Sequence, residues 1–194
     1  MKRKLLHYWR NNRGLAAIEF AFVLPIMLSM LLGLAELSNA LGLRAAVTNM
    51  ASTSADLIAQ ESSVTAADLT NVYGALNAML FSYPLADNNG NSLVTITITS
   101  VIDGGAGQAP KVAWSCTQSG TLQTKGSAPS VALPAGLITA GDGSSVIWGR
   151  ITYAYNSPIS YFLIGTKNWT NDFYEKPRRV LQIPITGTPA NCNT

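Results

Sequence analysis

A long apolar segment from Leu15 to Leu43 constrains this chain more than any other feature. Only two charged residues, Glu19 and Glu36, interrupt it. At about 1.5 Å per residue, the part from Leu15 to Ala35 makes a helix of roughly 31 Å, which matches the thickness of the hydrocarbon core of a bilayer. The sequence therefore predicts one membrane-spanning helix.

The charges beside this segment predict its orientation. Five basic residues precede it (Lys2, Arg3, Lys4, Arg10 and Arg13), whereas Arg44 is the only one that follows closely. Because basic residues are retained on the cytoplasmic side, we expect a cytoplasmic N-terminal tail and an exported remainder. Residues 15–194 then hold eight basic and ten acidic residues, a balance that indicates no nucleic-acid interface.

Glu19 is unusual because an ionised carboxylate inside hydrocarbon costs at least about 2.5 kcal/mol. Such a group needs a cation or a proton donor as its partner. If a peptidase cut the chain after Gly14, the new α-amino group would lie at Leu15, four residues before Glu19. Between two staggered helices, this amine and the carboxylate could pair and fix the register.

These residues resemble the type IV prepilin signal: a basic leader, Gly14 before the cleaved bond, and Glu19-Phe20 opening an apolar helix. Gly-x-x-x-x-Glu-Phe followed by such a segment is similar to the TadE/TadG-like minor pilins of the tight-adherence pilus. The resemblance implies that an aspartyl prepilin peptidase recognises Arg13 and Gly14 and cleaves the Gly14–Leu15 bond. It also implies that Leu15, Glu19 and Phe20 serve assembly with other pilin subunits.

Three further motifs resemble the same family. They are Gly33-Leu34-Ala35-Glu36-Leu37, Tyr153-Ala154-Tyr155-Asn156-Ser157-Pro158, and Tyr174-Glu175-Lys176-Pro177-Arg178-Arg179. In the last motif, Arg178 and Arg179 suit bidentate contacts to the carboxylates of a neighbouring subunit. The alternative is that both are solvated at the start of a strand.

Two other interpretations of the apolar segment stay open at this point. In the first, the helix is an ordinary uncleaved anchor and Glu19 reaches the headgroup layer. In the second, it is a secretory signal peptide cut after Ser38-Asn39-Ala40. The second is disfavoured, because the apolar segment exceeds the usual 7–15 residues and contains two acids.

The two cysteines and the one histidine limit the chemistry of the exported part. Cys116 and Cys192 both follow the span, and an oxidising compartment favours a disulfide between them worth up to about 4 kcal/mol. The alternative is two free thiols that lie apart. His7, the only histidine, precedes the span, so a Ser-His-Asp site or a zinc site is not expected in the exported part.

The pattern of apolar residues predicts two helices after the membrane and a small sheet. Leu43, Val47, Met50, Ser54 and Leu57 continue the first helix to about residue 62, and Thr65 and Asp68 form a capping box that starts a second. Alternation predicts a hairpin over Val94–Ile98 and Val112–Cys116, a strand over Val146–Tyr155, and a last strand over Val180–Ile185. A long loop is expected over Thr121–Ser145.

We therefore expect an α+β, pilin-like fold with a long N-terminal transmembrane helix, a second amphipathic helix and an antiparallel sheet of about four strands. The expected divisions are a cytoplasmic leader at 1–14, the long helix at 15–62 with its membrane part at about 15–43, and a periplasmic domain at 63–194. By resemblance, the chain is a minor pilin or pseudopilin that helps to assemble or prime a pilus.

The implied partners are the inner membrane, the prepilin peptidase, other pilin subunits and the assembly platform, with no cofactor, small-molecule substrate or enzymatic activity. Two competing functions remain. One is an unprocessed membrane scaffold of a pilus or secretion apparatus. The other is an adhesin that binds through a surface of Trp148, Tyr153, Tyr161 or Trp169, which predicts that these rings cluster on the surface.

Overall fold

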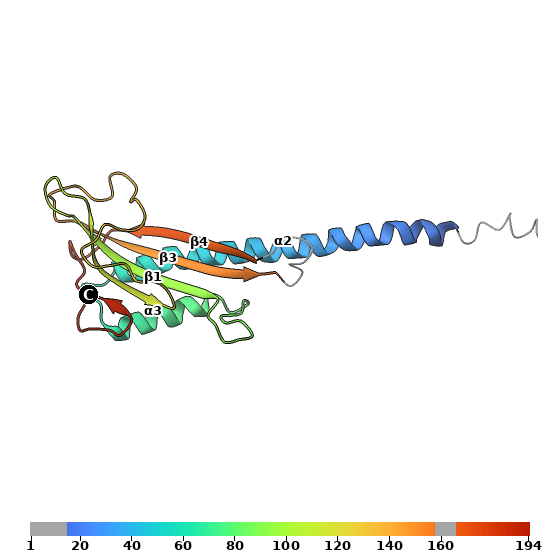
Figure 1. The fold of residues 1–194 in the computed structure, drawn as a ribbon, viewed down its shortest axis with the longest axis horizontal. Coiled ribbons are helices and arrows are strands. Elements are labelled where there is room, and N and C mark those ends of the chain that lie inside the picture. Colours follow the sequence, from blue (N-terminus) through green and yellow to red (C-terminus); the bar gives the residue numbers. More distant parts are fainter. Residues whose placement is uncertain (1–14, 158–165) are drawn as a thin grey trace, which may run out of the picture.

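The structure, a computed structural model, describes residues 15–157 and 166–194. One helix dominates it: α2 runs from Leu15 to Ala59 and continues through Pro25. Its first half projects alone from the domain, and its second half lies along the sheet (Figure 1). The molecule is therefore a rod with an α+β domain at one end.

The second helix, α3 (Ala66–Ala78), starts as predicted. The side chain of Thr65 accepts a hydrogen bond from the backbone N–H of Asp68, and the Asp68 carboxylate accepts one from the backbone N–H of Thr65. This reciprocal pair satisfies N–H groups that a helix start leaves unpaired. Leu69, Val72 and Leu76 form its buried face.

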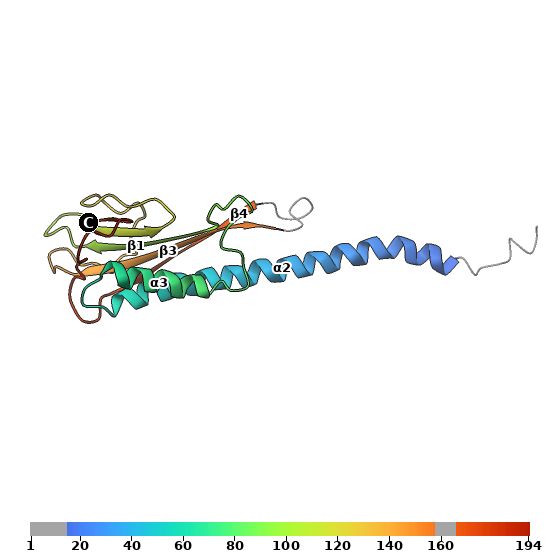
Figure 2. The ribbon, with the colours of Figure 1, turned by 90° about the horizontal axis from the view of Figure 1, so that it is seen from below.

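Five antiparallel strands form one sheet in the order β4-β3-β1-β2-β5. Their bounds are β1 Val94–Ile102, β2 Lys111–Gln118, β3 Ser145–Asn156, β4 Thr166–Glu175 and β5 Cys192–Asn193. The predicted hairpin, the third strand and the long loop before it are confirmed. Both helices cover the same face of the sheet (Figure 2).

The predicted strand over Val180–Ile185 is wrong. The segment is irregular, and Ile185 forms only a single parallel bridge to Val64. The strand beside β3 is instead β4, which pairs with it along its whole length. β4 is an edge strand with polar side chains on both faces, so its sequence lacks the alternation that marks a half-buried strand.

The core lies between the helices and the sheet. Its largest fully buried side chains include Leu43, Met50, Ile58, Leu76, Ile96, Ile98, Ile147, Ile151 and Tyr153. Helix α2 approaches β3 closely at Gly149, where a Cβ atom would lie 2.2 Å from the Ser54 hydroxyl oxygen and 2.9 Å from the Ala51 carbonyl oxygen. Glycine at this position lets the helix and the sheet touch through their backbones.

Candidate assembly site on the N-terminal helix

The N-terminal half of α2 contacts nothing else in the described part of the chain. Every residue from Leu15 to Ala35 is exposed apart from Gly33, which is half-buried. Large apolar side chains make up most of this surface, with Phe22 at 75% and Met30 at 64% exposure. A soluble protein does not leave such a rod bare, so this surface requires lipid or other helices.

Two of the predicted assembly residues lie at the free end of this rod. Leu15 is the first residue of α2, and Phe20 is 60% exposed. The predicted recognition residues Arg13 and Gly14 lie outside the described residues. The described part of the chain starts at Leu15, the residue that cleavage after Gly14 would make the new N-terminus.

Glu19 is exposed on the same rod. Among the described residues it has no hydrogen bond or ion pair. It lies one helical turn after Leu15, the spacing at which two side chains on a helix are neighbours. Its carboxylate is thus free for a partner outside this part of the chain.

Glu36 has a different environment from Glu19. It is 3% exposed and is the first of the α2 residues buried by the domain, followed by Ala40, Leu43 and Val47. The hydroxyl of Tyr155 on β3 donates a hydrogen bond of 2.6 Å to its carboxylate. Burial, followed by this hydrogen bond, raises the pKa of Tyr155 well above its usual value. The acid is therefore held by protein and does not face lipid.

The Glu36–Tyr155 pair connects two of the motifs identified in the sequence, Gly-x-x-Glu-Leu and Tyr-x-Tyr-x-x-Pro. The sequence alone indicates no role for Glu36. A signal was available, because stepping back from Leu43 by three and then four residues gives Ala40 and Glu36 on the same helical stripe. The missing information was the partner, which is distant along the chain.

A cavity of about 390 Å³ lies beside this pair. It is lined mainly by the turn after α3, the end of β3 and Asn39 of α2. Its tyrosine hydroxyls are engaged: Tyr153 donates to the Pro84 carbonyl at 2.6 Å, and Tyr83 donates to the Asn39 carbonyl at 3.3 Å. None of the described lining residues is a histidine or a cysteine.

Arg178 lies at the opposite end of the domain and serves the fold. Its guanidinium pairs with Asp56 of α2 and lies 3.7 Å from Glu175. Its backbone N–H donates to the carbonyl of Ala59, the last residue of α2. A cation at this position also interacts favourably with the negative C-terminal end of the α2 helix dipole. Arg179 is exposed and has no ion pair in the described part of the chain.

Cys116 and Cys192 form a disulfide. They face each other where β2 pairs with β5. The bond fixes the C-terminal segment to the sheet. Among the described residues, no group of three or more His, Cys, Asp or Glu side chains could hold a metal ion.

The aromatic residues of the adhesin hypothesis do not form an exposed cluster. Trp148 and Tyr153 are each 2% exposed, Trp169 is half-buried, and Tyr161 lies outside the described residues. The Trp148 indole N–H donates to Asp172 at 2.7 Å and its ring stacks on Tyr174. These rings hold the sheet together.

The fold and the bare helix fit one class: a single-pass membrane protein with an α+β domain attached to its N-terminal helix. Residues 14–56 match the family described as TadE-like protein. The match shows that this segment is similar to TadE-like proteins, and it covers less than half of the chain. The match coincides with α2 and does not extend to the sheet. No curated protein and no solved structure gives a significant match.

Proposed function

We propose that this chain is a minor pilin or pseudopilin of a tight-adherence pilus. Before assembly, it is stored in the inner membrane with residues 1–14 in the cytoplasm and residues 63–194 in the periplasm. A prepilin peptidase cleaves the Gly14–Leu15 bond, and α2 then packs among the helices of other subunits on the assembly platform.

One observation carries this proposal: the exposed carboxylate of Glu19, which has no ion pair or hydrogen bond among the described residues, lies one turn after Leu15 on a bare apolar helix. Cleavage would create an α-amino group at Leu15. On a neighbouring subunit, this amine would neutralise Glu19 and set the axial offset between the two helices. In a low-dielectric surrounding, a paired charge is far less costly than an isolated one.

N-terminal sequencing of the protein from cells that contain the peptidase tests the first step. We expect Leu15 as the first residue of the mature chain. Gly14→Leu is expected to block cleavage, so that the chain starts at Met1, or at Lys2 if the initiator methionine is removed. Recovery of an intact leader from wild-type cells would favour the unprocessed scaffold.

Counting pili on cells that carry Glu19→Gln tests the second step. We expect fewer or no pili, with the protein still present in the membrane. Glu61→Gln is the matched control, because Glu61 is exposed in the turn after α2 and the change in charge is the same. A normal pilus number with Glu19→Gln would contradict the pairing.

Arg179 is the stronger candidate for the predicted contact with a neighbouring subunit, since Arg178 is used within the domain. We expect Arg179→Gln to reduce pilus number without changing the stability of the domain. Arg178→Gln is expected to lower stability modestly, because an exposed ion pair contributes at most about 1 kcal/mol.

A further inference from the structure

The helix-facing row of β4 follows α2 in a regular register. Arg44 lies over the Trp169 ring at 5.6 Å, and the Asn171 amide donates to the Thr48 hydroxyl at 2.7 Å. Each step of two residues on the strand, about 6.6 Å, therefore matches four residues on the helix, about 6.0 Å. The helix can thus be used to measure how far each β4 residue lies from the membrane.

Extending this register by one step places Lys167 beside Ala40. An independent contact agrees, because Lys167 is the cross-strand partner of Tyr155, whose hydroxyl reaches Glu36. Lys167 thus lies between one and five residues beyond Ala35, the residue that precedes Glu36, the first buried residue of α2. Measured from Ala35, where the predicted hydrocarbon span of roughly 31 Å ends, this is about 2 to 8 Å at about 1.5 Å per residue, within the wider membrane part expected to reach about residue 43.

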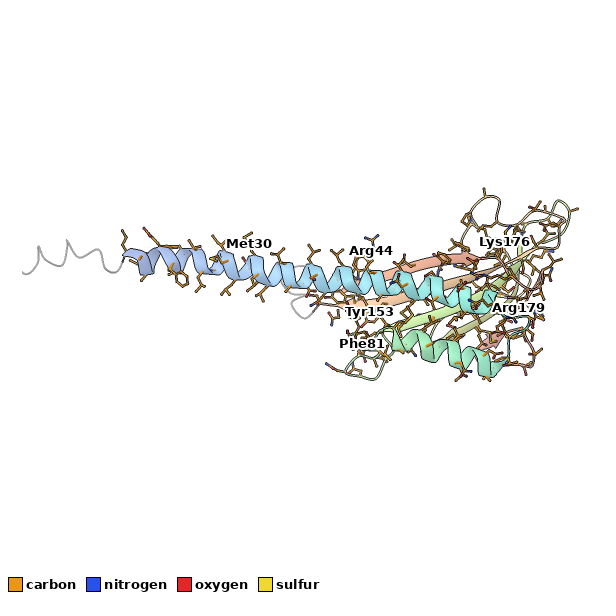
Figure 3. All side chains as sticks on the ribbon, turned by 180° about the vertical axis from the view of Figure 1, so that it is seen from behind. Met30, Arg44, Phe81, Tyr153, Lys176 and Arg179 are labelled. Atoms are coloured by element: carbon orange, nitrogen blue, oxygen red, sulfur yellow. A yellow bond between two sulfur atoms is a disulfide. The ribbon has the colours of Figure 1, made fainter. Side chains whose placement is uncertain are left out.

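That depth corresponds to the lipid headgroups, which add about 5 to 8 Å to each side of the core. Arg44 lies farther out along α2. Side chains on a helix lean in general toward its N-terminus, which is the membrane side here. The guanidinium of Arg44 lies over the Trp169 ring. Figure 3 places Arg44 beside the end of the sheet that is nearest to the bare part of the helix.

Neither cation is neutralised within the described residues. The ion pairs there join Arg150 to Asp172 and Arg178 to Asp56 and Glu175, and none includes Arg44 or Lys167. The side chains of Arg44 and Lys167 are exposed. Trp169 is half-buried, contacts Arg44, and follows Lys167 by two residues on β4. Aromatic rings flanked by cations are typical of the membrane–water interface.

The acids at this end of the domain are engaged elsewhere. Glu36 is buried and bonded to Tyr155. Asp87, on the connection between α3 and β1, accepts hydrogen bonds from the backbone N–H groups of Asn89 and Asn91. The end of the α2 and β4 flank that lies nearest to Glu36 is therefore cationic.

We propose that Lys167 and Arg44 bind the phosphate groups of anionic phospholipids in the leaflet next to the domain. Trp169 packs between the two cations at the edge of this headgroup layer. The inference uses the membrane-spanning position of α2, as does the proposed function, but not cleavage or pilus assembly. Each cation near an anionic surface contributes about 1 kcal/mol. The contact fixes which flank of the domain faces the membrane before the subunit is extracted.

The test is the rate at which a neutral amine-acylating reagent modifies Lys167 in the full chain, measured by mass spectrometry. The chain is placed in nanodiscs of phosphatidylcholine alone and of phosphatidylcholine with phosphatidylglycerol. We expect Lys167 to react about fivefold more slowly with phosphatidylglycerol, the factor that corresponds to about 1 kcal/mol. Lys125, exposed in the loop before β3, is the internal control and should react equally in both.

Equal rates for Lys167 in the two nanodiscs would overturn the proposal. In a third arm, phosphatidylcholine nanodiscs receive free inorganic phosphate, and equal protection there would show a free anion site and overturn the role of the bilayer. Arg44→Gln should reduce the protection of Lys167, whereas Arg179→Gln at the far end should leave it unchanged. N-terminal sequencing has no bearing on these rates, so failure of the lipid contact is distinguishable from failure of the pilin proposal.

Discussion

The hydroxyl of Tyr155 donates a 2.6 Å hydrogen bond to the carboxylate of Glu36 where α2 meets the domain. Removing this donor by Tyr155→Phe leaves a buried carboxylate without its partner. We expect the free energy of unfolding to fall by about 1 to 3 kcal/mol. Denaturant unfolding of the full chain in detergent, followed by near-ultraviolet circular dichroism, measures this change.

Thr170→Val is the control for Tyr155→Phe. It removes a hydrogen bond on the exposed face of the sheet, where the hydroxyl oxygens of Thr152 and Thr170 lie 3.0 Å apart. We expect a change within about 0.5 kcal/mol. Equal unfolding free energies for Tyr155→Phe and wild type would contradict a stabilising role for the buried pair.

Gly149 permits the close approach of β3 to α2, and Gly149→Ala should destabilise the domain. The added Cβ would lie 2.2 Å from the Ser54 hydroxyl oxygen, so the helix and sheet must move apart. We expect a loss of about 1 to 3 kcal/mol. Thermal unfolding of the full chain checks this value.

Gly74→Ala provides the opposite outcome from the same chemical change. A Cβ atom at Gly74 of α3 meets no atom within 4 Å. Alanine in a helix interior is preferred over glycine by about 0.5 to 1 kcal/mol, so this variant should be more stable than wild type. If both variants were destabilised equally, close contact would not be the cause at Gly149.

The disulfide between Cys116 and Cys192 closes a loop with a sequence separation of 76 residues. Reduction should lower the free energy of unfolding by about 4 kcal/mol in the chain-entropy description. The Cys116→Ser/Cys192→Ser double variant should match the reduced wild type and show no response to reductant. A reductant effect on the double variant would mean that reductant acts on something other than this bond.

The capping box of α3 predicts a pH dependence. Hydrogen bonds from Thr65 lower the pKa of Asp68 below its usual value. A carboxyl group with a lowered folded-state pKa stabilises the fold fully above its unfolded pKa of about 3.9 and loses that contribution as the pH falls through the folded value. Asp68→Asn should remove this part of the acid dependence, seen as a smaller loss of thermal stability between neutral and acidic pH. An unchanged acid dependence would contradict this role of Asp68.

Local patterns predicted much of the fold. The stripe through Leu43, Val47 and Met50 is buried, and the capping box at Thr65 is formed. The strand β4 is not predicted because Lys167 and Asn171 interrupt its helix-facing row, while Thr170 and Asp172 lie on the other face, so no apolar alternation marks it. Such an edge strand forms because it pairs with the neighbouring strand, here β3.

Of the two acids in the apolar segment, one could be given a role from the sequence and the other could not. Glu19 was identifiable from its place in an apolar segment beside a basic tail. Glu36 was not assigned a role, although it lies in the same segment. The difference is that Glu36 depends on Tyr155, which follows it by 119 residues.

The sequence by itself determined that α2 is long and apolar enough to span a membrane, because apolar length and flanking charge are local properties. Tertiary structure alone decided where the domain begins to bury α2, which acid is buried, and that Lys167 lies opposite Tyr155. These features depend on the register between α2 and strands more than 100 residues later. Side-chain packing across the sheet sets that register, and no local pattern encodes it.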